Sequence, residues 1–168
     1  METLNARYYK LILMRHAQAL PISAEMPDVQ RPLTEQGTHQ AKQMGSLFRE
    51  HHLMPDQILC SSSLRTQETA HHLGYASTQI TPNKELYGAL ASEILSLISA
   101  IPSHIKTLLV VAHNPSISQL ASRLAGRFLG DFAPATCVIL DFEFISWSKI
   151  DSSCPVSVTL HSPFTSTS

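Results

Sequence analysis

Short apolar runs rich in branched residues alternate with segments of helical period along most of this chain. The runs cover residues 9–14, 57–60, 107–112, 137–145 and 155–160, and the helical segments begin near Thr34, Leu64, Ser92 and Pro115. Strands separated by helices predict crossover connections and a mainly parallel sheet with helices on both faces. The last two runs have no helix between them, which predicts an antiparallel edge. The expected architecture is therefore a three-layer α/β fold.

Composition argues for one globular domain over residues 1–168, because 43% of the residues are apolar and 15% are charged. Residues 1–8 and 162–168 are expected to be loose termini. A net charge of -1 argues against a nucleic-acid or membrane surface, and no segment approaches the roughly 18 apolar residues of a membrane span. No signal peptide is apparent. Three irregularly spaced cysteines indicate reduced thiols and a cytoplasmic protein.

Three of the expected strands are followed by polar residues that suit an anion. Arg15 and His16 follow the first run, while Arg65 comes shortly after the second. His113 directly follows the third run, where a helix starts, and Arg31 lies in an upstream loop. The carboxyl ends of parallel strands meet at one edge of a sheet, often against helix N-termini. Because guanidinium groups bind phosphoryl oxygens in a bidentate way, the pattern predicts a local phosphate pocket.

Four motifs occur along the chain in the order LMRHAQA, DVQRPLTEQG, LCSSSLRTQETA and VVAHNPSISQL. In this order and spacing they resemble the histidine phosphatase superfamily over roughly residues 9–147. The short length and the RHA, RPLT and HNP sequences resemble its SixA-like phosphohistidine phosphatase branch. The resemblance implies a phosphoglycerate mutase-like fold and a phosphatase that uses no cofactor.

The resemblance also implies a role for each of the polar residues. His16 would be the nucleophile and would carry a covalent phosphohistidine intermediate. Arg15 and Arg65 would hold the non-bridging oxygens, Arg31 would close the pocket, and His113 would complete the phosphate cage. A neutral imidazole can attack phosphorus when a hydrogen bond to its other nitrogen fixes the tautomer. We expect no metal, because the arginines supply the positive charge.

The proton donor departs from the family pattern. Larger members carry a glutamate at the position that falls on Lys84 here, next to Glu85. Asp28, three residues before Arg31, is the second candidate, although both carboxylates would also suit a solvated or loop-capping role. An alkoxide leaving group needs a good acid, whereas the imidazole of a phosphohistidine leaves more readily. A weak donor therefore favours N–P bonds over sugar phosphates.

The expected substrate is phosphohistidine in a protein of a phosphorelay or phosphotransfer system, because 168 residues leave little room for a lid over the pocket. Two alternatives stay open. The chain could be a phosphatase of small phosphorylated metabolites with the same nucleophile, or a non-catalytic regulatory module that binds phosphate. Arg31 could also merely anchor its loop, and His113 could merely bond the backbone at the start of a helix.

Two other enzyme classes fit the sequence poorly. A metallohydrolase built on His16, His113 and a carboxylate would have its cation repelled by the nearby arginines. A cysteine phosphatase needs a C-x5-R loop, which would place the arginine at position 66, whereas Arg65 lies one residue closer to Cys60. The remaining histidines are expected at the surface: His39, His51, His52, His71, His72, His104 and His161.

Overall fold

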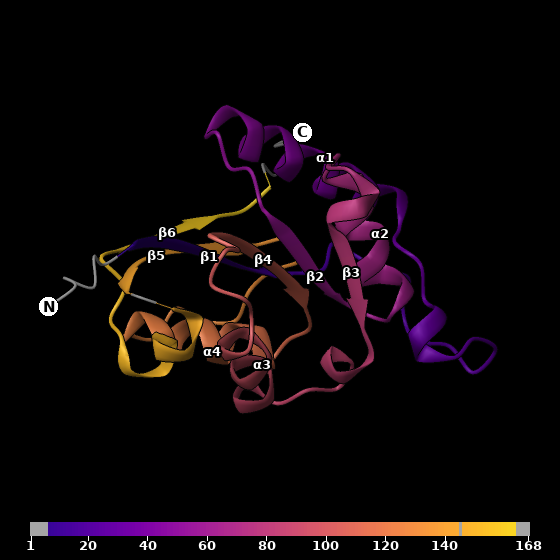
Figure 1. Cartoon of the computed structure of the whole chain (residues 1–168). Coiled ribbons are helices and arrows are strands. Elements are labelled where there is room, and N and C mark those ends of the chain that lie inside the picture. Colours follow the sequence, from indigo (N-terminus) through magenta and orange to yellow (C-terminus); the bar gives the residue numbers. More distant parts are fainter. Residues whose placement is uncertain (1–6, 145, 164–168) are drawn as a thin grey trace, which may run out of the picture.

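A six-stranded mixed sheet forms the centre of the computed structural model, which describes residues 7–144 and 146–163 (Figure 1). The strands are β1 (Arg7–Arg15), β2 (Gln57–Ser61), β3 (Ile80–Asn83), β4 (Thr107–Ala112), β5 (Cys137–Phe144) and β6 (Ser157–His161). Their order in the sheet is β3-β2-β4-β1-β5-β6. The four strands from β3 to β1 run parallel, whereas β5 is antiparallel to both β1 and β6. The expected parallel sheet with an antiparallel edge is confirmed.

Helices cover both faces of this sheet, as the alternating pattern predicts. The α-helices are α1 (Glu35–Glu50), α2 (Leu64–His72), α3 (Ala91–Ser99) and α4 (Ser116–Ala125). Short 3-10 helices are η1 (Asp28–Gln30), η2 (Ser77–Gln79), η3 (Lys84–Leu86) and η4 (Trp147–Ser152). Figure 1 shows α1 and α2 on one face and α3 and α4 on the other. Within the described ranges, no helix is long and apolar enough to span a membrane.

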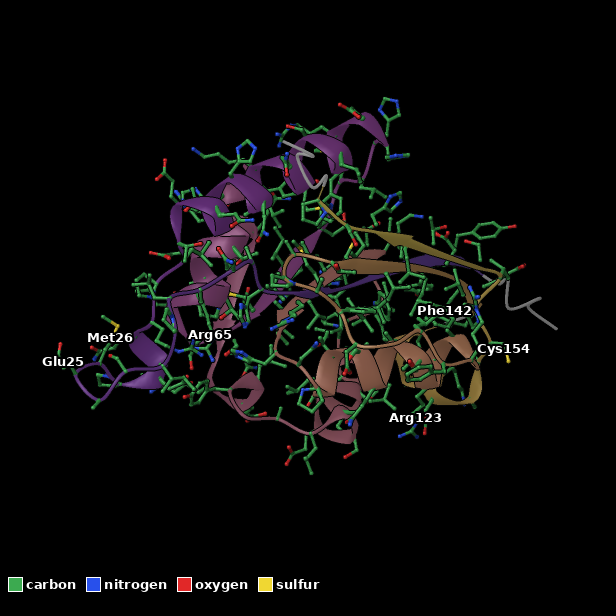
Figure 2. The ribbon with its side chains drawn as sticks, turned by 180° about the vertical axis from the view of Figure 1, so that it is seen from behind. Glu25, Met26, Arg65, Arg123, Phe142 and Cys154 are labelled. Carbon is green, nitrogen blue, oxygen red and sulfur yellow. The ribbon has the colours of Figure 1, made fainter. Side chains whose placement is uncertain are left out.

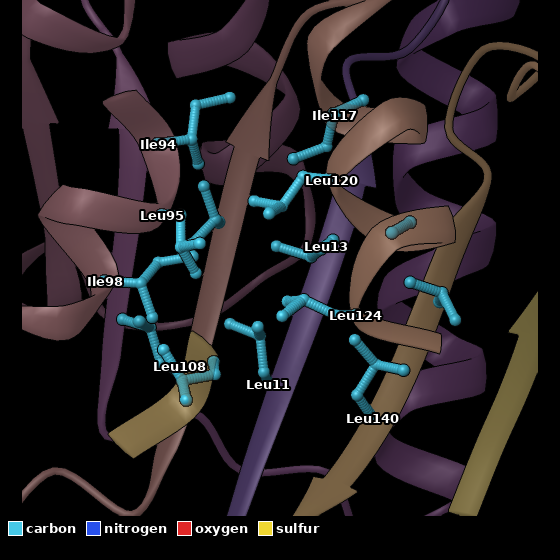
Figure 3. Packing of buried hydrophobic residues seen from close by; sticks show 14 of the residues in the cluster. Leu11, Leu13, Ile94, Leu95, Ile98, Leu108, Ile117, Leu120, Leu124 and Leu140 are labelled. Carbon is cyan, nitrogen blue, oxygen red and sulfur yellow. The ribbon is translucent and has the colours of Figure 1, made fainter. Parts of the chain in front are cut away.

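Strand β1 lies inside the sheet, and its side chains alternate between the two faces. Leu11 and Leu13 pack into the core under α3 and α4, which Figure 3 shows from close by. Ile12 and Met14 pack into the opposite core with α1 and α2. All four side chains are fully buried, and each contributes about 1.5–3 kcal/mol through burial of apolar surface. Both cores therefore fix the position of β1, and with it the position of the residues at its end.

Several boundaries differ from the sequence-based expectation. The edge strand β3 was not predicted, because it has only four residues and contains Pro82, a residue tolerated mainly in edge strands. Arg7 and Tyr8, expected in a loose terminus, pair with β5 as the start of β1. Helix α4 begins at Ser116, so Pro115 is its N-cap rather than its first residue. Ile145 and the segments 1–6 and 164–168 lie outside the described residues.

Candidate active site

The carboxyl ends of the parallel strands meet at a pocket of about 500 Å³. It is lined by all five residues expected to attack or bind phosphate, namely Arg15, His16, Arg31, Arg65 and His113. Arg15 ends β1 and His113 directly follows β4, two strands that pair in parallel with Arg15 opposite Ala112. This pairing brings the rings of His16 and His113 to 5.3 Å between centroids. The sheet topology therefore assembles one polar site from segments far apart in the sequence.

His16 is held by its own backbone and by its ring. Its amide donates to the carbonyl of Ala112 (3.1 Å), and its carbonyl accepts from the amide of Ala135 (3.1 Å). The ring Nδ1 lies 2.7 Å from the carbonyl oxygen of Ala17. Because a carbonyl can only accept, Nδ1 carries the proton and Nε2 keeps a lone pair. Burial lowers the pKa of His16 to about 3, so this imidazole is neutral at neutral pH.

The loop that follows His16 packs tightly against two helices. The amide of Ala17 donates to Oγ1 of Thr69 in α2 (3.0 Å). A Cβ added at Gly37 in α1 would lie only 2.0 Å from the backbone carbonyl oxygen of Gln18, which is too close for two atoms that are not bonded. A residue with a side chain at position 37 would therefore displace this loop. Glycine allows the backbone of α1 to approach the segment next to His16.

Arg15 and Arg65 bring guanidinium groups into the pocket. Arg15 donates from Nη1 to the carbonyl of Phe132 (2.7 Å), and burial lowers its pKa from the usual arginine value. Arg65 is only 5% exposed and donates from Nη1 to the carbonyl of Asp28 (2.8 Å). The Nε atoms of both arginines are buried without a hydrogen-bond partner in the described part of the chain. Buried donors of this kind suit an anion that enters the pocket.

His113 contacts Arg65 on one side and Ser61 on the other. Its Nδ1 lies 3.3 Å from Nη2 of Arg65, which can only donate, so Nδ1 is the acceptor. Its Nε2 then donates to Oγ of the buried Ser61 at 2.8 Å. Burial, followed by the charge of Arg65, lowers the pKa of His113 to about 4. This role of Ser61 was not predicted, because a run of three serines also suits a polar turn.

Asp28 joins Arg31, Arg65 and Tyr87 in one network. Arg31 donates from Nε to Oδ1 (2.9 Å), Arg65 donates from Nη2 to Oδ2 (3.1 Å), and the hydroxyl of Tyr87 donates to Oδ2 (2.6 Å). The Tyr87 bond, with those of the arginines, holds the pKa of Asp28 well below its usual value. Asp28 is therefore an ionised carboxylate inside the pocket. Tyr87 was not predicted as a site residue, because it lies far from Asp28 in the sequence and only folding brings its hydroxyl next to the carboxylate.

The other sequence candidates lie elsewhere. Glu85 lines a separate pocket of about 460 Å³ together with Glu93. Cys60 is buried, and burial raises the pKa of its thiol to about 11, which makes it a poor nucleophile. None of the seven remaining histidines is buried, as expected. Within residues 7–144 and 146–163, no three His, Cys, Asp or Glu side chains are grouped so that they could hold a metal ion.

The two site histidines, His16 buried and His113 half-buried, should make the protein less stable in mild acid. Their pKa values are about 3 and about 4 in the folded protein, below the ordinary value of 6.5 that they regain on unfolding. Below that value the unfolded chain binds protons that the folded chain does not bind. The free energy of unfolding should then fall by up to about 1.4 kcal/mol per pH unit for each histidine between about pH 6 and pH 4.5.

Urea denaturation at several pH values measures this slope. His72 and His161 also have lowered pKa values and add to the slope, so the informative comparison is with a variant. His16→Asn should reduce this slope by up to about 1.4 kcal/mol per pH unit, which is the contribution of one proton. An unchanged slope in that variant would mean that His16 is not buried as a neutral imidazole.

Comparisons with known proteins agree with this geometry. Residues 11–89 match the sequence model of the histidine phosphatase superfamily (branch 1). The phosphohistidine phosphatase SixA homolog of Haemophilus influenzae is 28% identical over 139 residues, 75% of this chain and 84% of that protein. An uncharacterized protein of Mycobacterium tuberculosis is 29% identical over 159 residues, 89% of this chain and 99% of that protein.

A solved structure extends the similarity to the whole fold. A candidate phosphohistidine phosphatase SixA from Nakamurella multipartitia superposes with a TM-score of 0.84 at 29% identity. The match covers 96% of this chain and 99% of that one. The comparisons thus agree on the family and on the overall fold. The chain belongs to the histidine phosphatase superfamily, and within it resembles the SixA-like phosphohistidine phosphatases.

Proposed function

We propose that this phosphatase removes phosphate from phosphohistidine in proteins, through a covalent phosphohistidine intermediate on His16. The observation that carries the proposal is the hydrogen bond of Nδ1 to the carbonyl of Ala17 (2.7 Å). It leaves Nε2 of a neutral imidazole as the nucleophile, in a pocket lined by three arginines. Arg15, Arg65 and Arg31 bind the phosphoryl oxygens, and His113 completes the cage.

The reaction has two transfers. In the first, the Nε2 lone pair of His16 forms a bond to phosphorus while the N–P bond of the substrate breaks. The departing imidazole keeps the bonding electron pair, and its ring takes up a proton. In the second transfer, water attacks the phosphorus on His16, the new N–P bond breaks, and inorganic phosphate leaves. The guanidinium groups stabilise the charge on the phosphoryl oxygens in both transfers.

Metal-free catalysis is part of the proposal. A guanidinium stays charged at any working pH and matches phosphoryl oxygens in a bidentate way. Three such groups in one pocket supply the positive charge that divalent cations supply in kinases and many other phosphoryl-transfer enzymes. They would also repel a divalent cation from the same place.

The chemistry of the leaving group favours a substrate in which phosphorus is bonded to nitrogen. Asp28 is ionised and so has no proton to give at neutral pH, whereas Glu85 lies at another pocket. We therefore assign neither carboxylate as a strong general acid. An alkoxide needs such an acid, but a phosphorylated imidazole can take its proton from water on the distal nitrogen. The SixA names of two relatives support the same substrate class.

Substrate comparison tests the proposal. We expect faster turnover of a phosphohistidine protein or peptide than of phosphorylated sugars, with no loss of activity in chelator. The label trapped on the protein from a labelled phosphohistidine donor should be acid-labile and alkali-stable, as an N–P bond is. A preference for sugars would instead assign a metabolite phosphatase, and phosphate binding without turnover would assign a regulatory module. Activity that disappears in chelator would contradict the metal-free mechanism.

A cytoplasmic location also belongs to the proposal. The three cysteines are free thiols, and the buried pair, Cys60 and Cys137, have pKa values raised by burial to about 11 and about 12. Unpaired thiols suit a reducing compartment, where phosphotransfer proteins would be available as partners.

A further inference from the structure

A carboxylate is an unexpected group in a pocket that binds phosphate, because both are anions that seek the same donors. Asp28 accepts from Arg31 through Oδ1 at 2.9 Å and from Arg65 through Oδ2 at 3.1 Å. Two of the three guanidinium groups in the pocket are therefore already paired with a negative charge. Arg15, the third of these guanidinium groups, has no carboxylate at ion-pair distance among the described residues.

We propose that Asp28 is an internal counter-anion that competes with phosphate for Arg31 and Arg65 and thereby speeds the release of product. The inference rests on the proposed function, because it concerns the inorganic phosphate that the second transfer leaves in the pocket. It assigns Asp28 a role through the arginines, without contact to the reacting atoms. Asp28 is thus a positioning residue whose charge sets how tightly the cage holds an anion.

The need for such a group follows from the charge in the pocket. Three guanidinium groups around a phosphate dianion attract it strongly. Arg65 is 5% exposed, so screening by solvent is weak at its position. A product held by these groups alone would leave slowly and limit turnover. A carboxylate within hydrogen-bond distance of two of them reduces the net attraction for the dianion.

The network around Asp28 keeps the carboxylate in the pocket. The hydroxyl of Tyr87 donates to Oδ2 (2.6 Å), and this bond helps to fix the side chain. The backbone carbonyl of Asp28 separately accepts from Nη1 of Arg65 (2.8 Å) and from the amide of Arg31 (3.2 Å). The position of Arg65 thus depends only partly on the carboxylate. The charge of Asp28 can therefore be removed while much of the geometry remains.

Asp28→Asn provides the test, because asparagine keeps the size and one acceptor oxygen of aspartate but not its charge. We expect the dissociation constant of inorganic phosphate, measured by titration calorimetry, to fall by about tenfold or more. The inhibition constant of phosphate in turnover should fall in parallel. In single-turnover and steady-state experiments, the first transfer should be less affected than multiple turnover, because release of phosphate becomes slower.

Two control variants separate charge from other effects. Tyr87→Phe breaks the same network but keeps the charge of Asp28, so it should not tighten phosphate binding. Glu25→Gln removes a charge from the same loop at an exposed position, and Figure 2 places Glu25 at the outer end of that loop, away from Arg65. It should leave the phosphate dissociation constant within about twofold.

The outcomes distinguish this inference from the proposed function. Wild-type protein that binds phosphate, with an Asp28→Asn variant that binds it equally or more weakly, would overturn the counter-anion role and leave the phosphatase proposal in place. Equal tightening in Tyr87→Phe would also overturn it, because the charge would not be the cause. A wild-type protein that binds no phosphate even at millimolar concentration would overturn the role of Asp28 together with the phosphate cage.

Discussion

His16→Ala should lower the rate of phosphate release by about 10⁴-fold or more, the scale seen when a covalent enzyme loses its nucleophile. The substitution removes Nε2, the only atom to which the proposed mechanism attaches the phosphoryl group. The same variant should accumulate no acid-labile label when it is incubated with a labelled phosphohistidine donor. Rates from single-turnover experiments and label after an alkaline quench measure the two effects.

His39→Ala is the matched control, because it removes an exposed histidine of α1. It should retain both activity and labelling. The His16→Ala variant should keep a cooperative thermal transition, because the ring lies in the polar pocket and not in either apolar core. Labelling that persists in a folded His16→Ala protein would show that another residue accepts the phosphoryl group.

Arg65→Ala should slow the chemical step by about 10³–10⁵-fold, the range found for an arginine that stabilises phosphoryl transfer. Arg65 lines the pocket and brings a nearly buried positive charge to it. Its removal also leaves Oδ2 of Asp28 without its guanidinium partner. Arg65→Lys should recover only part of the rate, since lysine restores the charge but not the bidentate geometry.

Arg123→Ala serves as the control for Arg65→Ala. Arg123 is exposed and pairs with Asp151 at the surface (2.6 Å), an arrangement worth little in stability. This variant should keep wild-type activity. Circular dichroism of all three arginine variants checks that they are folded. A folded Arg65→Ala protein with activity within tenfold of wild type would contradict the direct role of Arg65 in the transfer.

Much of the fold follows from local patterns in the sequence. The buried strand over residues 9–14 appears as a continuous apolar run, whereas the segment from Thr34 has apolar residues at helical spacing, so the two patterns are easily told apart. The convergence of Arg15, Arg65 and His113 was predictable, because parallel strands bring their carboxyl ends to one edge of the sheet. The spacing of apolar residues can be read directly from the sequence. The alternation of strands and helices then indicates the topology of the sheet.

The features that were missed depend on contacts between distant segments. Strand β3 exists because β2 offers a free edge to four residues that include a proline, and no period marks so short a run. Ser61 and Tyr87 gain their roles from single hydrogen bonds to His113 and Asp28, each reaching more than 50 positions along the chain. Serine and tyrosine occur in many settings, so nothing local separates these two from their neighbours.

The backbone contacts of His16 have a consequence for how the two transfers can follow one another. Its amide and carbonyl are bonded to Ala112 and Ala135, and the next amide is bonded to Thr69. Three separate segments therefore hold the main chain on either side of the ring, so the proposed phosphorylated form would keep nearly the same backbone as the free form. A change from the first proposed transfer, in which His16 attacks the donor, to the second, in which water attacks, would then involve side chains around the pocket and leave the sheet in place.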